Sequence, residues 1–288
     1  MNPYVICTDS ACDMSETILR DWEVGSASLR FRFEGEPEEY NNNELPAAAF
    51  YQKMRAGGVA KTSAVNVEDF KNLFAPYLEN GTDILYLGFS SGISTTYNSA
   101  RLAAQELAPA YPDRKILTVD TLAASAGVGL LIYLAVQQKK TGASIETVAQ
   151  YVTDLRLKLC HWFTVDDLQY LKRGGRVSPT AAFVGGVLGI KPVMHVDNEG
   201  KLIPMSKVRG RRAALQAMAD QYGQLVDPSI QAPVYISHGD CMQDVELLKK
   251  MLKEQYNADV EVVSDVGPVI GAHSGPGTLA LFFVGKER

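Results

Sequence analysis

Small hydroxyl residues and glycines gather in one short segment, residues 88–98. The segment follows an apolar, strand-like stretch and leads into a helix expected to begin near Thr95. The first turn of a helix exposes unpaired N–H groups and the positive end of the helix dipole. Serines and glycines placed there suit a carboxylate or a phosphate. The segment therefore predicts an anion-binding loop, with Ser94 as the N-cap of the helix.

The same loop also satisfies a hydrolase pattern. Residues 88–92 read Gly-Phe-Ser-Ser-Gly, which matches G-x-S-x-G between a strand and a helix, the position of a nucleophile elbow. Ser90 would then need an acid and a histidine further along the chain. Two pairs stand in that order, Asp240 with His273 and Asp166 with His238. An elbow serine leads directly into its helix, whereas residues 92–94 intervene here, so hydrolysis is the alternative and anion binding the preferred interpretation.

Composition narrows the class of protein. The chain has 288 residues, which favours two domains, and its 46% apolar and 21% charged residues are ordinary for a globular protein. A net charge of −5 without an arginine-rich run disfavours nucleic acid as a partner. The four cysteines show no C-x-x-C spacing and the four histidines are far apart, so we expect neither a metal site nor a disulfide framework.

The first residues and the apolar segments indicate where in the cell the protein is expected. The N-terminus lacks the basic stretch and long apolar core of a signal peptide. No run reaches the about 18 apolar residues that a membrane span needs. We expect a cytoplasmic protein that makes at most transient contact with a membrane and has no stable insertion.

Strand and helix patterns alternate in the first half of the chain. Strands are expected at residues 4–8, 28–33, 84–88 and 116–119, and helices at 15–21, 47–55, 67–79, 95–107, 123–139 and 145–158. Such alternation is typical of a parallel sheet with helices on both faces. We predict an N-terminal three-layer α/β/α domain over residues 1–157.

The second half has a different pattern. Strands are expected at residues 163–165, 192–196, 202–208, 234–238, 260–263 and 278–284, with helices at 211–225 and 243–256. A hairpin at 197–200 joins two of the strands. We predict a C-terminal two-layer α/β domain over residues 158–288, whose mixed six-stranded sheet has helices on one face and the first domain on the other.

Four polar segments are expected to converge. Residues 8–10, 90–94 and 120–121 follow strands, and Thr62-Ser63 enters from an irregular segment. Ligands of doubly wound sheets bind beyond the carboxyl ends of the strands, where such loops meet. Asp9 and Asp120 could equally be helix caps, so their role stays open.

Several motifs together resemble the DegV family of bacterial fatty-acid-binding proteins. They lie, in the order typical of the family, at residues 5–14, 62–63, 89–97, 165–178, 189–192 and 270–277. The resemblance spans nearly the whole chain. It implies a two-domain fold of the dihydroxyacetone-kinase and DegV type, with one long-chain fatty acid in a tunnel between the domains.

The resemblance also implies roles for individual residues. Thr62 and Ser94 should bind the carboxylate, with His273 beside it. Ser63, Ser90 and Ser91 belong to the same polar segments, and Phe89 and Ile93 are our candidates for the tunnel mouth. A partner fatty acid kinase would phosphorylate the bound acid for lipid metabolism, so the chain itself would be a carrier without a cofactor, not an enzyme.

Two departures from the family pattern affect the expected site. The family commonly continues Thr-Ser with Gln-Pro, where this chain has Ala64-Val65, and commonly has glycine where this chain has Thr95. These changes affect the loop conformation and the room near the head group. A phosphotransferase subunit related to dihydroxyacetone kinases is a third interpretation, but no P-loop pattern supports it.

Two further segments have open interpretations. Lys172, Arg173 and Arg176 form the clearest local basic cluster, which is either a solvated turn or a docking patch for the kinase. The glycine-rich apolar segment 181–190 either lines the tunnel or belongs to the core.

Overall fold

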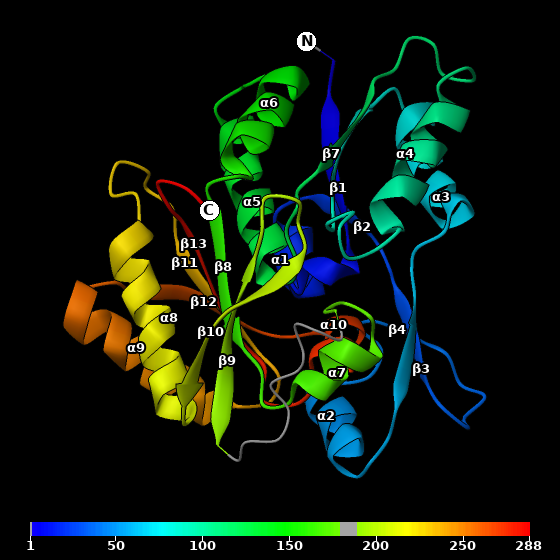
Figure 1. Ribbon diagram of the computed structural model, residues 1–288. Coiled ribbons are helices and arrows are strands. Elements are labelled where there is room, and N and C mark those ends of the chain that lie inside the picture. Colours follow the sequence, from blue (N-terminus) through cyan, green and yellow to red (C-terminus); the bar gives the residue numbers. More distant parts are fainter. Residues whose placement is uncertain (1, 179–188) are drawn as a thin grey trace.

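The structure is a computed structural model that describes residues 2–178 and 189–288 (Figure 1). In the first half of the chain, four strands form a parallel sheet in the order β2-β1-β6-β7. The strands are β1 (Tyr4–Asp9), β2 (Val24–Ala27), β6 (Asp83–Gly88) and β7 (Ile116–Asp120). The 3-10 turn η1 (Ser10–Cys12) and the helix α1 (Glu16–Asp21) lie between β1 and β2.

Helices cover both faces of this sheet, as predicted. They are α3 (Val67–Glu79), α4 (Thr96–Leu107), α5 (Ala126–Lys140) and α6 (Ile145–Leu155). Successive side chains of a strand point to opposite faces. Accordingly, Ile84 and Tyr86 of β6 pack in one apolar cluster with α3 and α4, whereas Leu85 and Leu87 pack in another with α5 and α6. The three-layer α/β/α arrangement is therefore confirmed.

Residues 28–33 contain the predicted strand, but its expected place in the parallel sheet was wrong. They do not join the parallel sheet, in which the short strand β2 takes that place. Instead β3 (Arg30–Phe33) forms a separate antiparallel sheet with β4 (Tyr40–Asn41) and β5 (Ala60–Ser63), and α2 (Ala47–Arg55) packs beside it. The rings of Phe31 and Phe33 contact Phe50 of α2. The sequence Val-Gly-Ser-Ala of β2 carries a weak strand signal, so the stronger apolar pattern after it was assigned to the wrong sheet.

The second half of the chain forms the predicted mixed sheet of six strands, in the order β10-β9-β8-β13-β11-β12. The strands are β8 (Leu159–Thr164), β9 (Ile190–Val196), β10 (Leu202–Arg209), β11 (Val234–His238), β12 (Val260–Asp265) and β13 (Leu279–Val284). Only β11 and β12 pair in parallel. The predicted hairpin connects β9 and β10, and Gly200 adopts φ 74° in its turn.

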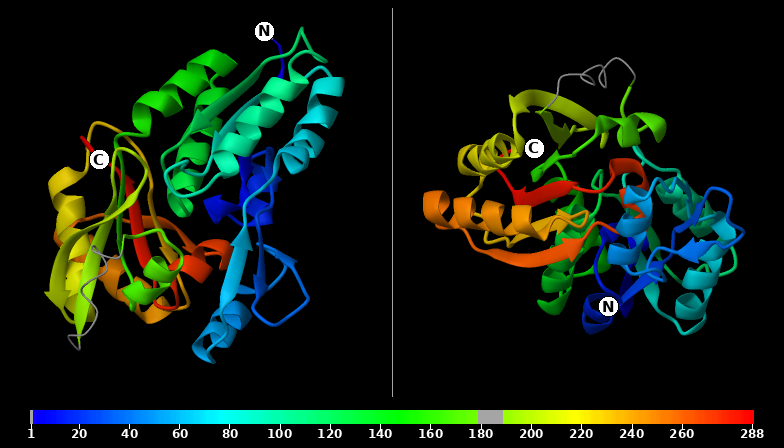
Figure 2. Two further views of the ribbon diagram at one scale, coloured as in Figure 1. Left: turned by 45° about the vertical axis from the view of Figure 1, so that its right-hand side comes forward. Right: turned by 90° about the horizontal axis from the view of Figure 1, so that it is seen from below.

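This sheet packs differently on its two faces. Cys160 and Trp162 of β8 point to the face covered by α8 (Arg211–Leu225) and α9 (Met242–Tyr256). Leu159 and Phe163 point to the other face, where α5 packs. Because α5 also contacts β1 and β6, one helix lies between the two sheets, and the two lobes are visible in Figure 2. No helix in the described ranges is long and apolar enough to cross a membrane.

Two short helices were not expected from the sequence. They are α7 (Leu168–Arg173) and α10 (Pro268–Ser274), which pack against each other. Both are shorter than the window over which helical periodicity is recognisable. α10 also contacts α2 and β5 of the first half, so it brings the second half of the chain against the three-stranded sheet. The domain boundary at residue 157 stays a prediction.

Candidate functional site

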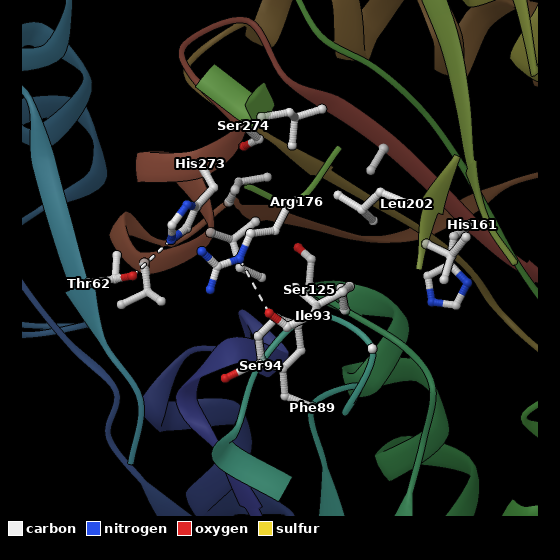
Figure 3. A pocket seen from close by; sticks show the side chains of 18 of the residues that line it. Thr62, Phe89, Ile93, Ser94, Ser125, His161, Arg176, Leu202, His273 and Ser274 are labelled. Atoms are coloured by element: carbon white, nitrogen blue, oxygen red, sulfur yellow. Dashed lines mark hydrogen bonds between the residues drawn. The ribbon is translucent and has the colours of Figure 1, made fainter. Parts of the chain in front are cut away.

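A cavity of about 460 Å³ lies where the elements of the two lobes meet (Figure 3). Its volume is within the range of roughly 300–1,000 Å³ that is typical of small-molecule sites. Much of its wall is apolar, formed by Phe163, Leu171, Val196, Leu202, Val266, Val269, Ile270, Ala280 and Phe282. Such a wall suits a hydrocarbon better than a sugar or a nucleotide.

One end of the cavity pairs a hydroxyl with an imidazole. Thr62 Oγ1 lies 2.8 Å from His273 Nε2 (Figure 3). Thr62 lies in β5, paired with Phe31 of β3, and His273 lies in the last turn of α10. Burial, together with the charges of Arg176 and Arg173, lowers the pKa of His273 to about 4. The imidazole is therefore neutral at pH 7, with one N–H donor and one acceptor nitrogen.

The predicted anion loop is shaped by two aspartates. The buried carboxylate of Asp9 accepts hydrogen bonds from Phe89 N at 3.0 Å and from the hydroxyl of Tyr86. Asp120 accepts one from Ser91 N at 3.2 Å. Neither aspartate is among the residues that line the cavity. Both aspartates hold the loop in shape, and Asp9 is also a cap, since it accepts a hydrogen bond from Ala11 N at 3.1 Å at the start of η1. Burial raises the pKa of Asp9.

Ser94 lies in the cavity wall, but it is not the N-cap. The helix begins at Thr96, with Thr95 at the cap position. Ser94 Oγ accepts a hydrogen bond from Thr96 N at 3.2 Å and lies 2.9 Å from Thr96 Oγ1. Thr95 has φ −79°, which an L-residue adopts without strain, so the threonine that replaces the family's glycine fits here. Likewise Val65 of the second departure is buried in the core, while Ala64 lines the cavity.

Ser90 occupies a different position from the one expected. Its buried hydroxyl donates to the carbonyl of Gly200 at 2.8 Å and accepts from Gly92 N at 3.1 Å, and the residue is absent from the cavity wall. This placement argues against both the ligand contact and the nucleophile. The nominated partners have other contacts: His273 pairs with Thr62, His238 lies near Asp265, Asp240 pairs with Arg55 and Asp166 pairs with Lys191. Neither acid–histidine pair forms among the described residues.

The predicted basic cluster divides between the cavity and the surface. Lys172 and Arg173 are exposed, and the guanidinium of Arg173 lies 5.0 Å from the ring centre of Tyr170. The side chain of Arg176 instead enters the cavity, where Nε donates to the carbonyl of Ile93 at 3.3 Å (Figure 3). Gly175, with φ 70°, turns the chain back after α7. Arg176 therefore belongs to the cavity wall, and the docking role stays a prediction for Lys172 and Arg173.

The remaining predicted residues can now be placed. Ser63, Phe89, Ser91 and Ile93 all line the cavity together with Thr62, Ser94 and His273. Sequence reasoning missed the polar lining residues of the second lobe and of the start of α5. These are Ser125, His161, Ser237, Ser274 and Thr278. Residues 181–188 of the proposed tunnel segment lie outside the described ranges.

Comparisons with known proteins identify the class of this chain. The sequence model of the family described as "Uncharacterised protein, DegV family" matches residues 3–286. A DegV domain-containing protein of Clostridium perfringens is 43% identical, over 100% of this chain and 99% of the relative. The fatty acid-binding protein of Thermotoga maritima is 36% identical, over 98% of each chain.

A solved structure with a similar fold is also described by fatty acid binding. It describes fatty acid binding of a DegV family protein from Thermus thermophilus, and it superposes with a TM-score of 0.86 at 29% identity. The match covers 99% of this chain and 100% of that one. The chain therefore belongs to the DegV family, whose fold it has and whose relatives include proteins named for fatty acid binding.

Proposed function

We propose that this protein binds one long-chain fatty acid in the cavity between its lobes. The observation that carries the proposal is the lining of one cavity. Much of its wall is apolar, and Thr62, Ser94 and His273 form a polar end. The relatives named for fatty acid binding support the same ligand.

The energy of such a complex comes mainly from the tail. A sixteen-carbon acid has about fourteen methylenes, and burial at roughly 0.8 kcal/mol each gives a gross gain of about 11 kcal/mol. Micromolar binding requires about 8 kcal/mol after the cost of association. The head-group contacts therefore mainly orient the acid and prevent the loss that an unpaired buried carboxylate would cause.

The carboxylate has three kinds of partner at the polar end. In the tautomer with the proton on Nε2, His273 donates to Thr62 Oγ1, which leaves the Thr62 hydroxyl free to donate to the carboxylate. Ser94 offers a second hydroxyl, and Arg176 supplies the positive charge of the cavity wall. Charge-assisted hydrogen bonds of this kind are stronger than neutral ones.

The proposal extends to a kinase partner that phosphorylates the bound acid. The exposed side chains of Lys172 and Arg173 are available to an acidic partner surface, whereas Arg176 is engaged in the cavity. We expect Arg173→Glu to weaken phosphorylation by such a kinase and to leave lipid affinity unchanged. Loss of both would show that Arg173 is needed for the fold or the lipid site, and would remove its docking role.

Native mass spectrometry of the purified protein tests the central claim. A single added mass that organic extraction identifies as a long-chain fatty acid is the expected result. A protein that is empty and cannot be loaded with stearate would contradict the proposal. Covalent labelling of Ser90 by a fluorophosphonate would restore the hydrolase alternative, which the Ser90–Gly200 hydrogen bond disfavours.

A further inference from the structure

A buried histidine, His161, lies in the cavity wall away from the head-group end. His161 is 1% exposed, and neither of its ring nitrogens makes a hydrogen bond of normal geometry to a described residue, its contact with the backbone of Leu159 being a weak one. Figure 3 shows it beside Leu202, on the opposite side of the cavity from Thr62 and His273. A buried imidazole without partners is destabilising, because its nitrogens lose their hydrogen bonds to water and gain none in return.

The position of His161 is fixed by the strand that carries it. Side chains alternate along β8, so His161 shares a face with Leu159 and Phe163, toward α5 and the cavity. In the neighbouring strand β13, Phe282 is its register partner, and the two rings meet edge to face at 5.5 Å. The imidazole therefore stands among apolar side chains, where its ring packs against Phe282 but its two nitrogens gain no strong polar partner.

The backbone of α5 makes room for the ring. A Cβ atom added to Gly127 would lie 2.5 Å from His161 Nε2, so only glycine allows this approach. The torsion that turns an imidazole is broad and roughly two-fold, so the ring can present either edge to the cavity. Because bulk solvent does not reach a side chain that is 1% exposed, a partner for these nitrogens must enter through the cavity.

The charge state limits what that partner can be. Burial, with the nearby charge of Arg288, keeps the pKa of His161 well below 6.5, so the ring is neutral and offers one donor and one acceptor. Within the described wall, Arg176 is the one lysine or arginine side chain, and it interacts at the head-group end. The guanidinium of Arg288 already donates to the carbonyls of Leu159, Leu122 and Asp197. A second carboxylate at the His161 end would therefore be unpaired. A hydroxyl matches a neutral imidazole in both of its roles.

We propose that the cavity region around His161 is a subsite for an oxygenated acyl chain, and that the preferred ligand is a long-chain fatty acid carrying a hydroxyl remote from its carboxylate. The inference rests on the proposed function and refines its ligand class. Sites that hydrogen-bond a ligand hydroxyl discriminate strongly against the analogue that lacks it, because their own polar group is then left unpaired.

The test compares stearic acid with its monohydroxy derivatives. Dissociation constants are measured on delipidated protein for stearate and for the acids hydroxylated at the tenth, twelfth or terminal carbon. We expect one of these isomers to bind better than stearate, and His161→Leu to shift the ratio of the two affinities about tenfold toward stearate. His161→Gln, which keeps a donor and an acceptor, should retain part of the preference.

A neighbouring substitution provides the matched control. Phe163→Leu shortens an apolar side chain on the same face of β8 and should lower affinity for both acids by the same factor, leaving their ratio unchanged. The ligand-free His161→Leu protein should melt at a higher temperature than the parent, which also shows that it folds.

Two results would overturn the inference. If stearate binds and no hydroxy isomer is preferred, or if His161→Leu leaves the ratio unchanged, His161 has no ligand role while the proposed function stands. If none of the acids binds, the proposed function itself fails, and the subsite with it.

Discussion

The two ends of the cavity differ in how their polar groups are satisfied. At the head-group end, Thr62 pairs with His273 and Arg176 with the carbonyl of Ile93. At the far end, His161 has no such partner in the described chain. At the head-group end, these groups already bond to one another without a ligand and can rearrange to accept one. The far end is completed only by what enters, so the head-group end should govern affinity and the far end should govern ligand choice.

The largest effect should follow the loss of the cation at the head-group end. We expect Arg176→Ala to weaken stearate binding about a hundredfold, because a hydrogen-bonded charge pair in a partly buried site contributes roughly 1.5–3 kcal/mol. Titration of delipidated protein with stearate measures the change. Arg173→Ala is the matched control, since this exposed arginine interacts with Tyr170 outside the cavity, and its affinity should stay within about twofold of the parent.

If Arg176→Ala and the parent bind stearate with equal affinity, the head-group end does not govern affinity as argued above. The carboxylate would then lie away from Arg176, and the two ends would have to be reassigned. Equal losses in both arginine variants would instead indicate a general electrostatic contribution.

The next effect concerns pH and the histidine of the head-group end. The pKa of His273 is about 4 in the folded protein and about 6.5 when unfolded, so acidification protonates the unfolded chain first. The stability due to the neutral ring is complete above pH 6.5 and decreases as the pH falls toward 4, by up to about 3 kcal/mol. Urea unfolding at both ends of this range measures the loss.

The variant His273→Asn isolates this contribution. It should lose less stability than the parent over the same pH range. His195, with a pKa of about 4, and His161, whose pKa is also lowered by burial, keep part of the dependence in both proteins. Identical pH dependence of parent and variant would show that His273 is not buried in a neutral state, and the network at this end would need revision.

The smallest effect should come from a single hydroxyl. Thr62→Val keeps the shape of the side chain but removes the contact with His273, and we expect stearate affinity to fall about tenfold. Thr141→Val, which removes an exposed hydroxyl outside the cavity, should change affinity by less than about twofold. Thr62→Val should leave the ratio of the affinities for hydroxystearate and stearate unchanged, because we expect the far end of the cavity to determine that ratio. This result would support the difference between the two ends.

Local signals predicted much of the fold. Helix α3 begins where Asn66 and Asp69 form a capping box, and its predicted bounds were correct. The helices α2 and α8 and the strand β11 also have the predicted bounds. The strand β3 was assigned to the wrong sheet because the pattern along one strand does not show which other strand it pairs with in space.

The candidate site was predictable only in part, for the same reason. Thr62, Ser94 and His273 belong to recognisable motifs, and the structure brings them to one cavity. Arg176 was assigned to the surface because a run of basic residues does not show which of them a glycine turn directs inward. His161 gave no signal, since every residue of β8 is buried and only the pairing with β13 shows which ones face the cavity.

The hydrogen bond from Ser90 to Gly200 fastens the tip of the β9–β10 hairpin onto the anion loop. The contact is close on both sides, since a Cβ on Gly92 would lie 2.6 Å from the carbonyl oxygen of Glu199. A relative rotation of the two lobes would therefore pull directly on the loop that carries Ser94. We expect that separation of the lobes at this hairpin would also disturb the head-group contacts of Ser94, so entry of an acyl chain and binding of its carboxylate would be coupled.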